Sequence, residues 1–205
     1  MTSPTTDVID LLVGITAGSP LDRLRAERPE TRLNAQKSYQ ALFEPAHDGD
    51  VTQDERLAIA VFVAGLHAAA GVSGFYASGL ADRALATAVE TEVEKGGTHG
   101  PYGRYPAGPL SSEDRAGLIY EVSGDSRNVL GQKLAAALEH SHLLVFRPRE
   151  ASVGALQKLL NAGWTTTGAV TLSQIVAFLA FQIRVVTGLK ALAVASADTA
   201  QSASV

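Results

Sequence analysis

The chain has 205 residues, of which 46% are hydrophobic and 19% charged, and its formal net charge is -4 at pH 7. These values are ordinary for a globular protein with one large helical domain or two small ones. The acidic balance argues against a nucleic-acid partner. The complete absence of cysteine excludes any chemistry that needs a thiol from this chain.

The first third of the chain carries start signals for helices. Thr6 or Asp7 can cap a first short helix, and Ser19 followed by Pro20 opens a second one. A third helix is expected over about 30–43. We therefore expect this segment to be helical throughout, with short breaks.

A capping box, Thr52-Gln-Asp-Glu55, opens the most apolar helix of the first half. A further helix is expected to begin after Gly71 or Gly74 and to continue to about Lys95. These signals predict two long helices packed in the core.

The segment 96–109 holds much of the glycine and proline of the chain, together with two tyrosines. It must be a loop. We expect this loop to join two helical halves, about 1–95 and 111–195, within one all-α domain over 1–195.

The second half repeats the helical pattern. Ser111 or Ser112 is expected to open a short helix through Tyr120, and a longer helix follows from Asp125 or Ser126 to the region of Pro148.

Two further caps follow near the end of the chain. Ser152 caps a helix that Gly163 is placed to stop, and Thr171-Leu-Ser-Gln174 is a second capping box that opens the last helix. The segment 196–205 is rich in alanine, serine and threonine and is expected to be a disordered tail.

The segment Leu172–Ala195 is long enough to cross a membrane but contains Gln182, Arg184 and Lys190. A charge at the middle of a bilayer costs at least about 2.5 kcal/mol. We therefore expect a helix buried in protein and no membrane association. The start of the chain has no basic and apolar leader, so the expected location is the cytoplasm.

Three stretches together resemble the alkylhydroperoxidase D-like superfamily, which includes the carboxymuconolactone decarboxylases. They are Asp54–Gly65, Gly100–Asp114, and the segment from His142 to Arg149 continued by Trp164-Thr-Thr-Thr and by Leu172–Leu192. The second and third resemble a peroxidase-related branch called CMD domain proteins, with Phe-Gln-x-Arg-Val-x-x-Gly-Leu at 181–189 as the most specific pattern. The resemblance implies an all-α bundle and a homo-oligomer, a trimer or a hexamer.

The resemblance also implies a Cys-x-x-Cys-x-x-x-His site after the acidic start of a helix. In the peroxidase members, one thiolate attacks the peroxide and the second cysteine resolves the product as a disulfide. Counted from Glu55 without gaps, these positions fall on His67, Ala70 and Gly74, and a two-residue insertion moves them to Ala69, Val72 and Tyr76. Both cysteines and the histidine are absent in either alignment. A direct thiol peroxidase is therefore excluded, although the family as a whole is associated with antioxidant activity.

Three residues remain as candidate catalytic groups. Glu55 is either a buried general acid or base, as the resemblance implies, or simply the carboxylate of the capping box. His67 is either a general base or a histidine satisfied within an apolar helix. Arg184 lies in a strongly apolar helix and is either half of a structural ion pair, with Glu55 as a possible partner, or an anion-binding group beside Gln182.

The candidate ligand-binding residues are Tyr76, Gln182 and two tyrosines of the glycine-rich loop. Tyr76 is either a hydroxyl donor to a ligand or an amphipathic wall residue. Tyr102 and Tyr105 share their loop with Arg104, and this loop is either a lid over a pocket or a subunit contact. We expect no metal and no cofactor: His140 and His142 are two residues apart and diverge on a helix, and no carboxylate has suitable spacing.

Two functions remain open. The first is thiol-free acid–base chemistry on a small organic acid, or binding of one, with Glu55, His67 and Arg184 converging in a pocket. The second is a non-catalytic oligomer that supports a cysteine-bearing relative.

Overall fold

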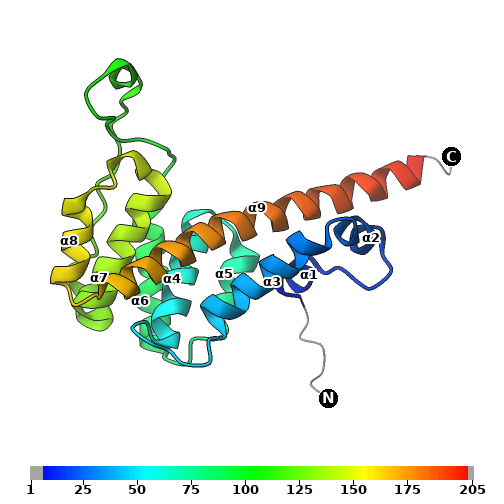
Figure 1. The fold of residues 1–205 in the computed structure, drawn as a ribbon, viewed down its shortest axis with the longest axis horizontal. Helices are drawn as coiled ribbons and strands as arrows, with labels where there is room; N and C mark the ends of the chain where they lie inside the picture. Colours follow the sequence, from blue (N-terminus) through cyan, green and yellow to red (C-terminus); the bar gives the residue numbers. More distant parts are fainter. Residues whose placement is uncertain (1–6, 203–205) are drawn as a thin grey trace. The chain divides into compact units, whose positions relative to one another are not determined.

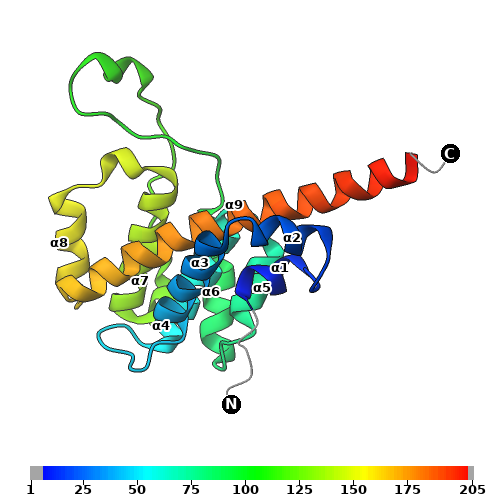
Figure 2. The same cartoon turned by 45° about the vertical axis from the view of Figure 1, so that its right-hand side comes forward.

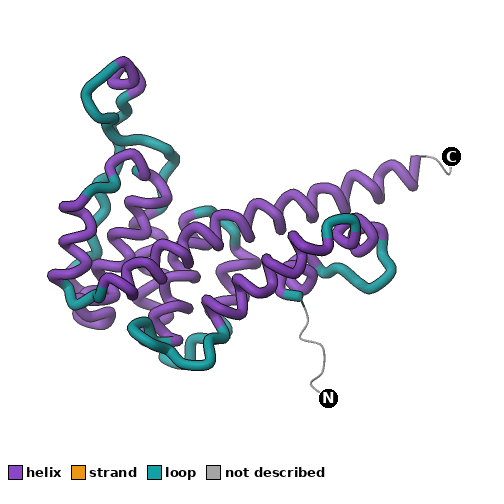
Figure 3. The backbone as a smooth tube through the Cα atoms, in the orientation of Figure 1, coloured by secondary structure: helices purple, strands orange, loops and turns teal. Residues whose placement is uncertain are grey.

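The computed structural model describes the backbone of residues 7–202 and the side chains of residues 7–195. Within that part of the chain the protein is all helical, and the only β-type pairing is an isolated bridge between Gly103 and Arg115. Figure 3 shows how helix dominates the backbone, with the longest loop path between the sixth and seventh helices. The all-α prediction is confirmed.

Within the described residues, the chain forms two compact units, one of residues 7–45 and 180–202 and the other of residues 46–179. This division differs from the expected halves, 1–95 and 111–195, because the last helix contributes to both units and the N-terminal helices form a unit with its C-terminal part.

The first unit contains three N-terminal helices and the C-terminal part of α9 (Figure 1). Its helices are α1 (Val8–Val13), α2 (Pro20–Ala26), α3 (Pro29–Phe43) and the part of α9 from Ala180 onward. Asp7 caps α1 by accepting the backbone N–H groups of Ile9 and Asp10, and Ser19 caps α2. Both caps were predicted from the sequence.

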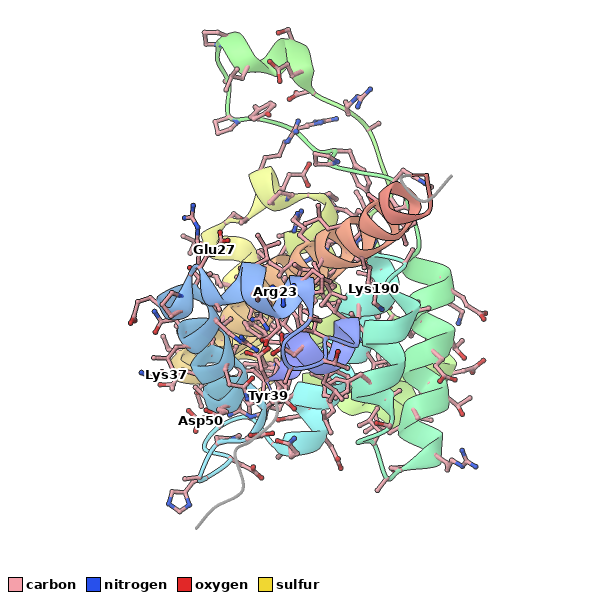
Figure 4. All side chains as sticks on the ribbon, turned by 90° about the vertical axis from the view of Figure 1, so that its right-hand side faces the viewer. Arg23, Glu27, Lys37, Tyr39, Asp50 and Lys190 are labelled. Carbon is pink, nitrogen blue, oxygen red and sulfur yellow. The ribbon has the colours of Figure 1, made fainter. Side chains whose placement is uncertain are left out.

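Ion pairs join the N-terminal helices of the first unit. Arg25 of α2 pairs with Asp7 and Asp10, and Arg32 of α3 pairs with Asp10 and Asp22. Figure 4 labels three other charged side chains, Arg23 of α2, Glu27 directly after α2 and Lys37 of α3, which are exposed to solvent. The paired charges are therefore the ones that hold α1, α2 and α3 together.

The second unit is built around α4, whose residues 58–64 are at most 2% exposed. Its elements are α4 (Gln53–Leu66), α5 (Ala70–Ala77), α6 (Arg83–Gly96), η1 (Pro109–Glu113), α7 (Gly124–Phe146), η2 (Pro148–Glu150), α8 (Val153–Asn161) and the start of α9 (Thr166–Ser202). Helices α5, α6 and α7 contact α4. A Cβ on Gly65 would come within 2.5 Å of Val93, so this glycine lets α4 and α6 approach closely.

Two predicted helices of the second unit are wrong. The helix expected from Gly71 or Gly74 to Lys95 is divided into α5 and α6, because Asp82 caps a new start by accepting the N–H groups of Ala84 and Leu85. The helix expected from Ser112 to Tyr120 is replaced by the 3-10 turn η1 and an extended segment, in which the backbone pairs with Gly103.

Helix α9 begins before the predicted capping box. Thr165 accepts the N–H of Gly168 at 2.9 Å and acts as the cap. Thr171 lies inside the helix, where its hydroxyl donates to the carbonyl of Thr167. The backbone of α9 is described to Ser202, so helix is found over 196–202, where a disordered tail was expected; the side chains of those residues and all of 203–205 lie outside the described part of the chain.

Within the described residues, the segment Thr166–Ala195 of α9 has the length and composition of a membrane span, and half of its most apolar window is buried inside the protein. Such a pattern also belongs to core helices, so it gives no reason by itself to place the chain in a membrane.

Candidate functional site

Glu55 has a structural role at the start of α4. Its carboxylate accepts the N–H of Thr52 at 2.9 Å, while the Thr52 hydroxyl accepts the N–H of Glu55 at 3.2 Å, which completes the predicted capping box. The same carboxylate forms an ion pair with Lys133 of α7 at 2.8 Å. Lys133 also lies over the ring of Trp164, 4.9 Å from its centre. Glu55 therefore ties the start of α4 to α7.

His67 lies at the opposite end of the same helix. It is the C-terminal cap of α4, twelve residues after Glu55. A rise of about 1.5 Å per residue separates the two backbones by about 18 Å. The two groups cannot act on one small ligand, so α4 does not bring together the acid–base pair that the sequence suggested.

Arg184 and Gln182 lie on the part of α9 that belongs to the first unit. Arg184 is exposed, and its guanidinium donates to the carbonyl of Ala180, one turn earlier, at 2.6 Å. The ion pair expected for a buried arginine is not formed, because solvent reaches the side chain and Lys133 is the partner of Glu55. Gln182, two residues before Arg184, is fully buried.

The three tyrosines are separated in the same way. Tyr76 of α5 is 1% exposed and packs edge-on against Phe75, with ring centres 5.1 Å apart. Tyr102 is stacked on Phe146 and donates its hydroxyl to the carbonyl of Leu118 at 3.1 Å. The ring of Tyr105 lies under the guanidinium of Arg149 at 4.0 Å. Each tyrosine therefore has a packing role. Tyr76 shares no contact with Tyr102 or Tyr105 among those described above.

A cavity of about 350 Å³ in the second unit is the strongest candidate site. It is lined by α7, by α8 and by the segment 119–121, and α7 and α8 are neighbours in Figure 1. Its polar lining comprises Tyr120, Glu121, Glu139, His140, His142, Arg147, Glu150, Ser152 and Lys158. The volume is at the lower end of the range for small-molecule sites, about 300–1,000 Å³.

His140 is the unusual member of this lining. The residue is only 6% exposed, yet its imidazole has no hydrogen-bond partner among the described residues. Burial lowers the pKa of His140 below its usual 6.5, so the ring is neutral at pH 7. A neutral imidazole offers one N–H donor and one acceptor nitrogen, both of which a ligand in the cavity can use.

Most charges of the cavity are already paired. Glu139 forms an ion pair with Arg127 and accepts the N–H of Val122 at 3.1 Å, and Arg147 pairs with Glu150. Lys158, on α8, has no ion-pair partner among the described side chains. Lys158 is therefore the cation that is available to an anionic ligand beside His140. The exposed Glu121 lies on the segment 119–121, which lines another part of the cavity.

A buried carboxylate supports one wall of the cavity. Glu92 of α6 is fully buried and accepts the hydroxyl of Tyr120 at 2.7 Å, the hydroxyl of Ser123 at 2.6 Å and the ammonium of Lys95 at 3.2 Å. Burial alone would raise the pKa of Glu92, but the hydrogen bonds from Ser123, Tyr120, Ser126 and Lys95 outweigh it and lower the pKa to about 2. Burial and the bond to Glu92 together raise the pKa of Tyr120, which stays protonated.

His142 continues this wall by stacking. Its ring lies 4.7 Å from that of Tyr120 and 4.9 Å from that of Phe146, and its Nε2 is 3.0 Å from the carbonyl oxygen of Gly96. Burial lowers the pKa of His142 to about 4 despite this hydrogen bond. His142 is thus a neutral structural residue that fixes Tyr120, whereas His140 is left open to the cavity.

Spacing alone did not identify this site. Two histidines at i and i+2 on a helix point in different directions, and the sequence gave no reason to join either of them to residues 119–121. Both nevertheless line the same cavity, because that segment and α8 cover a broad part of α7. No group of three metal-ligating side chains is present in the part of the chain that the structure describes.

Comparison with known proteins gives no match: no family model, no curated protein and no solved structure is similar to this chain. What the fold and site define is therefore an all-helical protein with a histidine-containing cavity between α7 and α8.

Proposed function

We propose that the protein binds a small organic acid in the cavity between α7 and α8 and that His140 is its acid–base group. The observation that carries the proposal is the imidazole of His140, which lines the cavity and has no hydrogen bond to a described residue. The ring nitrogens of His140 are not among the fully buried polar atoms that lack a partner, so they are open to the cavity and can hydrogen-bond to a ligand there. Lys158 offers the charge for a carboxylate.

The proposal changes the residues expected to act. Glu55 and His67 are too far apart, and Glu55 is occupied by the capping box and Lys133. The cavity supplies a different set: a neutral base, His140, and a cation, Lys158. This set suits proton transfer to or from an organic acid without a thiol, as in the decarboxylases of the superfamily that the sequence resembles.

The test is a titration of the protein with acetate, succinate and benzoate, followed through the ring signals of the five histidines by two-dimensional NMR. At least one acid should shift the His140 signals saturably, and His140→Phe should abolish binding. His47→Gln is the matched control, since His47 is an exposed histidine of the same unit that does not line the cavity. No saturable shift with any acid, or unchanged binding by the His140→Phe variant, would refute the proposal.

A peroxide assay separates this function from that of the thiol peroxidases. With a dithiol as reductant, the purified protein should consume no peroxide above the rate of the buffer, because a chain without cysteine has neither the nucleophile nor the resolving sulfur. Robust turnover would contradict this assignment.

A second candidate is an oligomeric scaffold, on its own or with a cysteine-bearing relative. It is favoured by large apolar side chains that are exposed on the first unit: Leu11 at 56%, Leu33 at 46% and Val194 at 62%. Such surfaces are common at subunit contacts. We propose a homo-oligomer, a trimer or hexamer; light scattering after gel filtration would show it, and a monomer at micromolar concentration would exclude it.

A further inference from the structure

The long loop between α6 and α7 folds back on itself and forms a second polar cavity. Gly103 donates its N–H to the carbonyl of Arg115 at 2.7 Å and accepts the N–H of Arg115 at 3.1 Å. This pairing brings the two strands of the loop side by side, with η1 at the tip, as Figure 2 shows. It places Arg104 and Arg115 next to one another.

The base of the loop is held in place. The backbone N–H of Tyr102 donates to the carbonyl of Phe146 at 2.8 Å, and the two rings are stacked. Glu150 accepts the N–H of Arg104 at 2.9 Å. Gly103 has a φ of +114°, and a Cβ there would lie 3.0 Å from the carboxylate of Glu150, so the sequence needs glycine at this position. The arginines are therefore presented from a fixed backbone.

The cavity measures about 770 Å³, and three arginines line it: Arg104, Arg115 and Arg147. Its carboxylates are Asp114 and Glu150. Both are committed, since Asp114 accepts the N–H of Tyr105 at 2.7 Å and Glu150 pairs with Arg147 in addition to its bond with the N–H of Arg104. The lining thus carries one net positive charge.

The guanidinium groups of Arg104 and Arg115 have no ion pair or hydrogen bond with any described residue. Both side chains are exposed and line the same cavity, so their guanidinium groups are available to an anion there. A guanidinium presents two parallel N–H donors, which match the oxygen pairs of a phosphate group, and a tetrahedral phosphate has enough oxygens for two such forks.

We propose that this cavity is a binding site for the phosphate group of a small phosphorylated ligand, with Arg104 and Arg115 as its direct contacts. The volume exceeds what a lone phosphate fills, so the remainder of the ligand lies along Tyr102 and residues 116–117. Arg147 and Glu150 form the boundary with the His140 cavity, because both residues line both cavities. The site does not depend on the function proposed for His140.

The test is a calorimetric titration of the full-length protein with inorganic phosphate at low ionic strength. We expect binding that weakens as salt is raised. Arg104→Gln and Arg115→Gln should each weaken it by about tenfold, since each removes a charge-assisted fork. Arg83→Gln is the matched control: Arg83 is an exposed arginine of the same unit that lines neither cavity, and its loss should leave the affinity unchanged.

Three outcomes would overturn the proposal: no phosphate binding at millimolar concentration, equal affinity in the two loop variants and the wild type, or an equal loss with Arg83→Gln. Misfolding is checked by melting temperature, which should be unchanged because the two guanidinium groups make no contact that stabilises the fold. His140→Phe should bind phosphate as the wild type does, so that failure here is distinguishable from failure of the organic-acid proposal.

Discussion

Replacing Glu92 by glutamine tests the support of the cavity wall most directly. The substitution Glu92→Gln keeps the size of the side chain and removes its charge. In the native protein that charge accepts bonds from Tyr120, Ser123 and Lys95 without exposure to water. Glutamine has only one acceptor oxygen. Its NH2 group would stand in place of the second carboxylate oxygen, and it cannot accept the hydrogen bonds that this oxygen accepts.

The expected loss follows from the pKa of Glu92. Folding lowers this pKa from 4.5 to about 2, and each pKa unit corresponds to about 1.4 kcal/mol, which gives about 3 kcal/mol. Because the folded-state pKa is the lower one, this stabilisation is fully present above pH 4.5 and is lost as the pH falls toward 2. The free energy of unfolding of Glu92→Gln should therefore be about 3 kcal/mol lower than that of the wild type at pH 7. This difference should shrink below pH 4.5.

Urea unfolding followed by circular dichroism at pH 7, 4.5 and 3 measures both quantities at a fixed protein concentration. Glu90→Gln is the control, since Glu90 is exposed on the same helix and its loss should change stability by no more than about 0.5 kcal/mol. If Glu92→Gln is as stable as this control at pH 7, or if its deficit is the same at every pH, the reasoning about the buried carboxylate is wrong.

Four further predictions concern stability, each measured by urea unfolding. Burial lowers the pKa of His142 to about 4, so the neutral ring stabilises the fold above about pH 6.5 and this stabilisation is lost as the pH falls toward 4. The free energy of unfolding of His142→Phe should therefore decline less steeply than that of the wild type over this interval. Equal slopes for the two proteins would contradict the assignment. A Cβ on Gly117 would overlap the ring of Tyr102, so Gly117→Ala should destabilise by about 2 kcal/mol, whereas Gly188→Ala, which meets no atom within 4 Å, should stabilise α9 by up to about 1 kcal/mol. Trp164 donates its indole N–H to the carbonyl of Lys133 at 2.7 Å, so Trp164→Phe should cost about 1–2 kcal/mol, and a neutral result would show that water replaces the bond.

Helix starts with a local cap were largely predictable from the sequence. The caps at Asp7, Ser19, Thr52 and Ser152 depend on a side chain and the next few N–H groups, so neighbouring residues are enough to define them. Thr171 shows the limit of this reasoning, because an identical pattern lies inside a helix when an earlier residue already supplies the cap.

Features that depend on distant segments were not predictable. The extended path of 114–123 follows from the pairing of Arg115 with Gly103, and no local signal encodes that partner. The cavity likewise joins residues 119–121 to α7 and α8. His140 was visible in the sequence, but its open position on the wall depends on which segments cover the rest of α7. Glu92 gave no signal at all, since a glutamate in a helix with a polar face is usually exposed.

The ion pair between Arg147 and Glu150 has a thermodynamic consequence, because both side chains belong to the walls of two cavities. A ligand that draws Arg147 away from Glu150 in one cavity leaves a carboxylate without its cation in the other. The affinities of the two cavities are then linked, and linkage is reciprocal: the factor by which the first ligand changes the affinity for the second equals the factor in the reverse direction. Arg147→Lys would alter that factor while it leaves Glu150 in place to hold the N–H of Arg104.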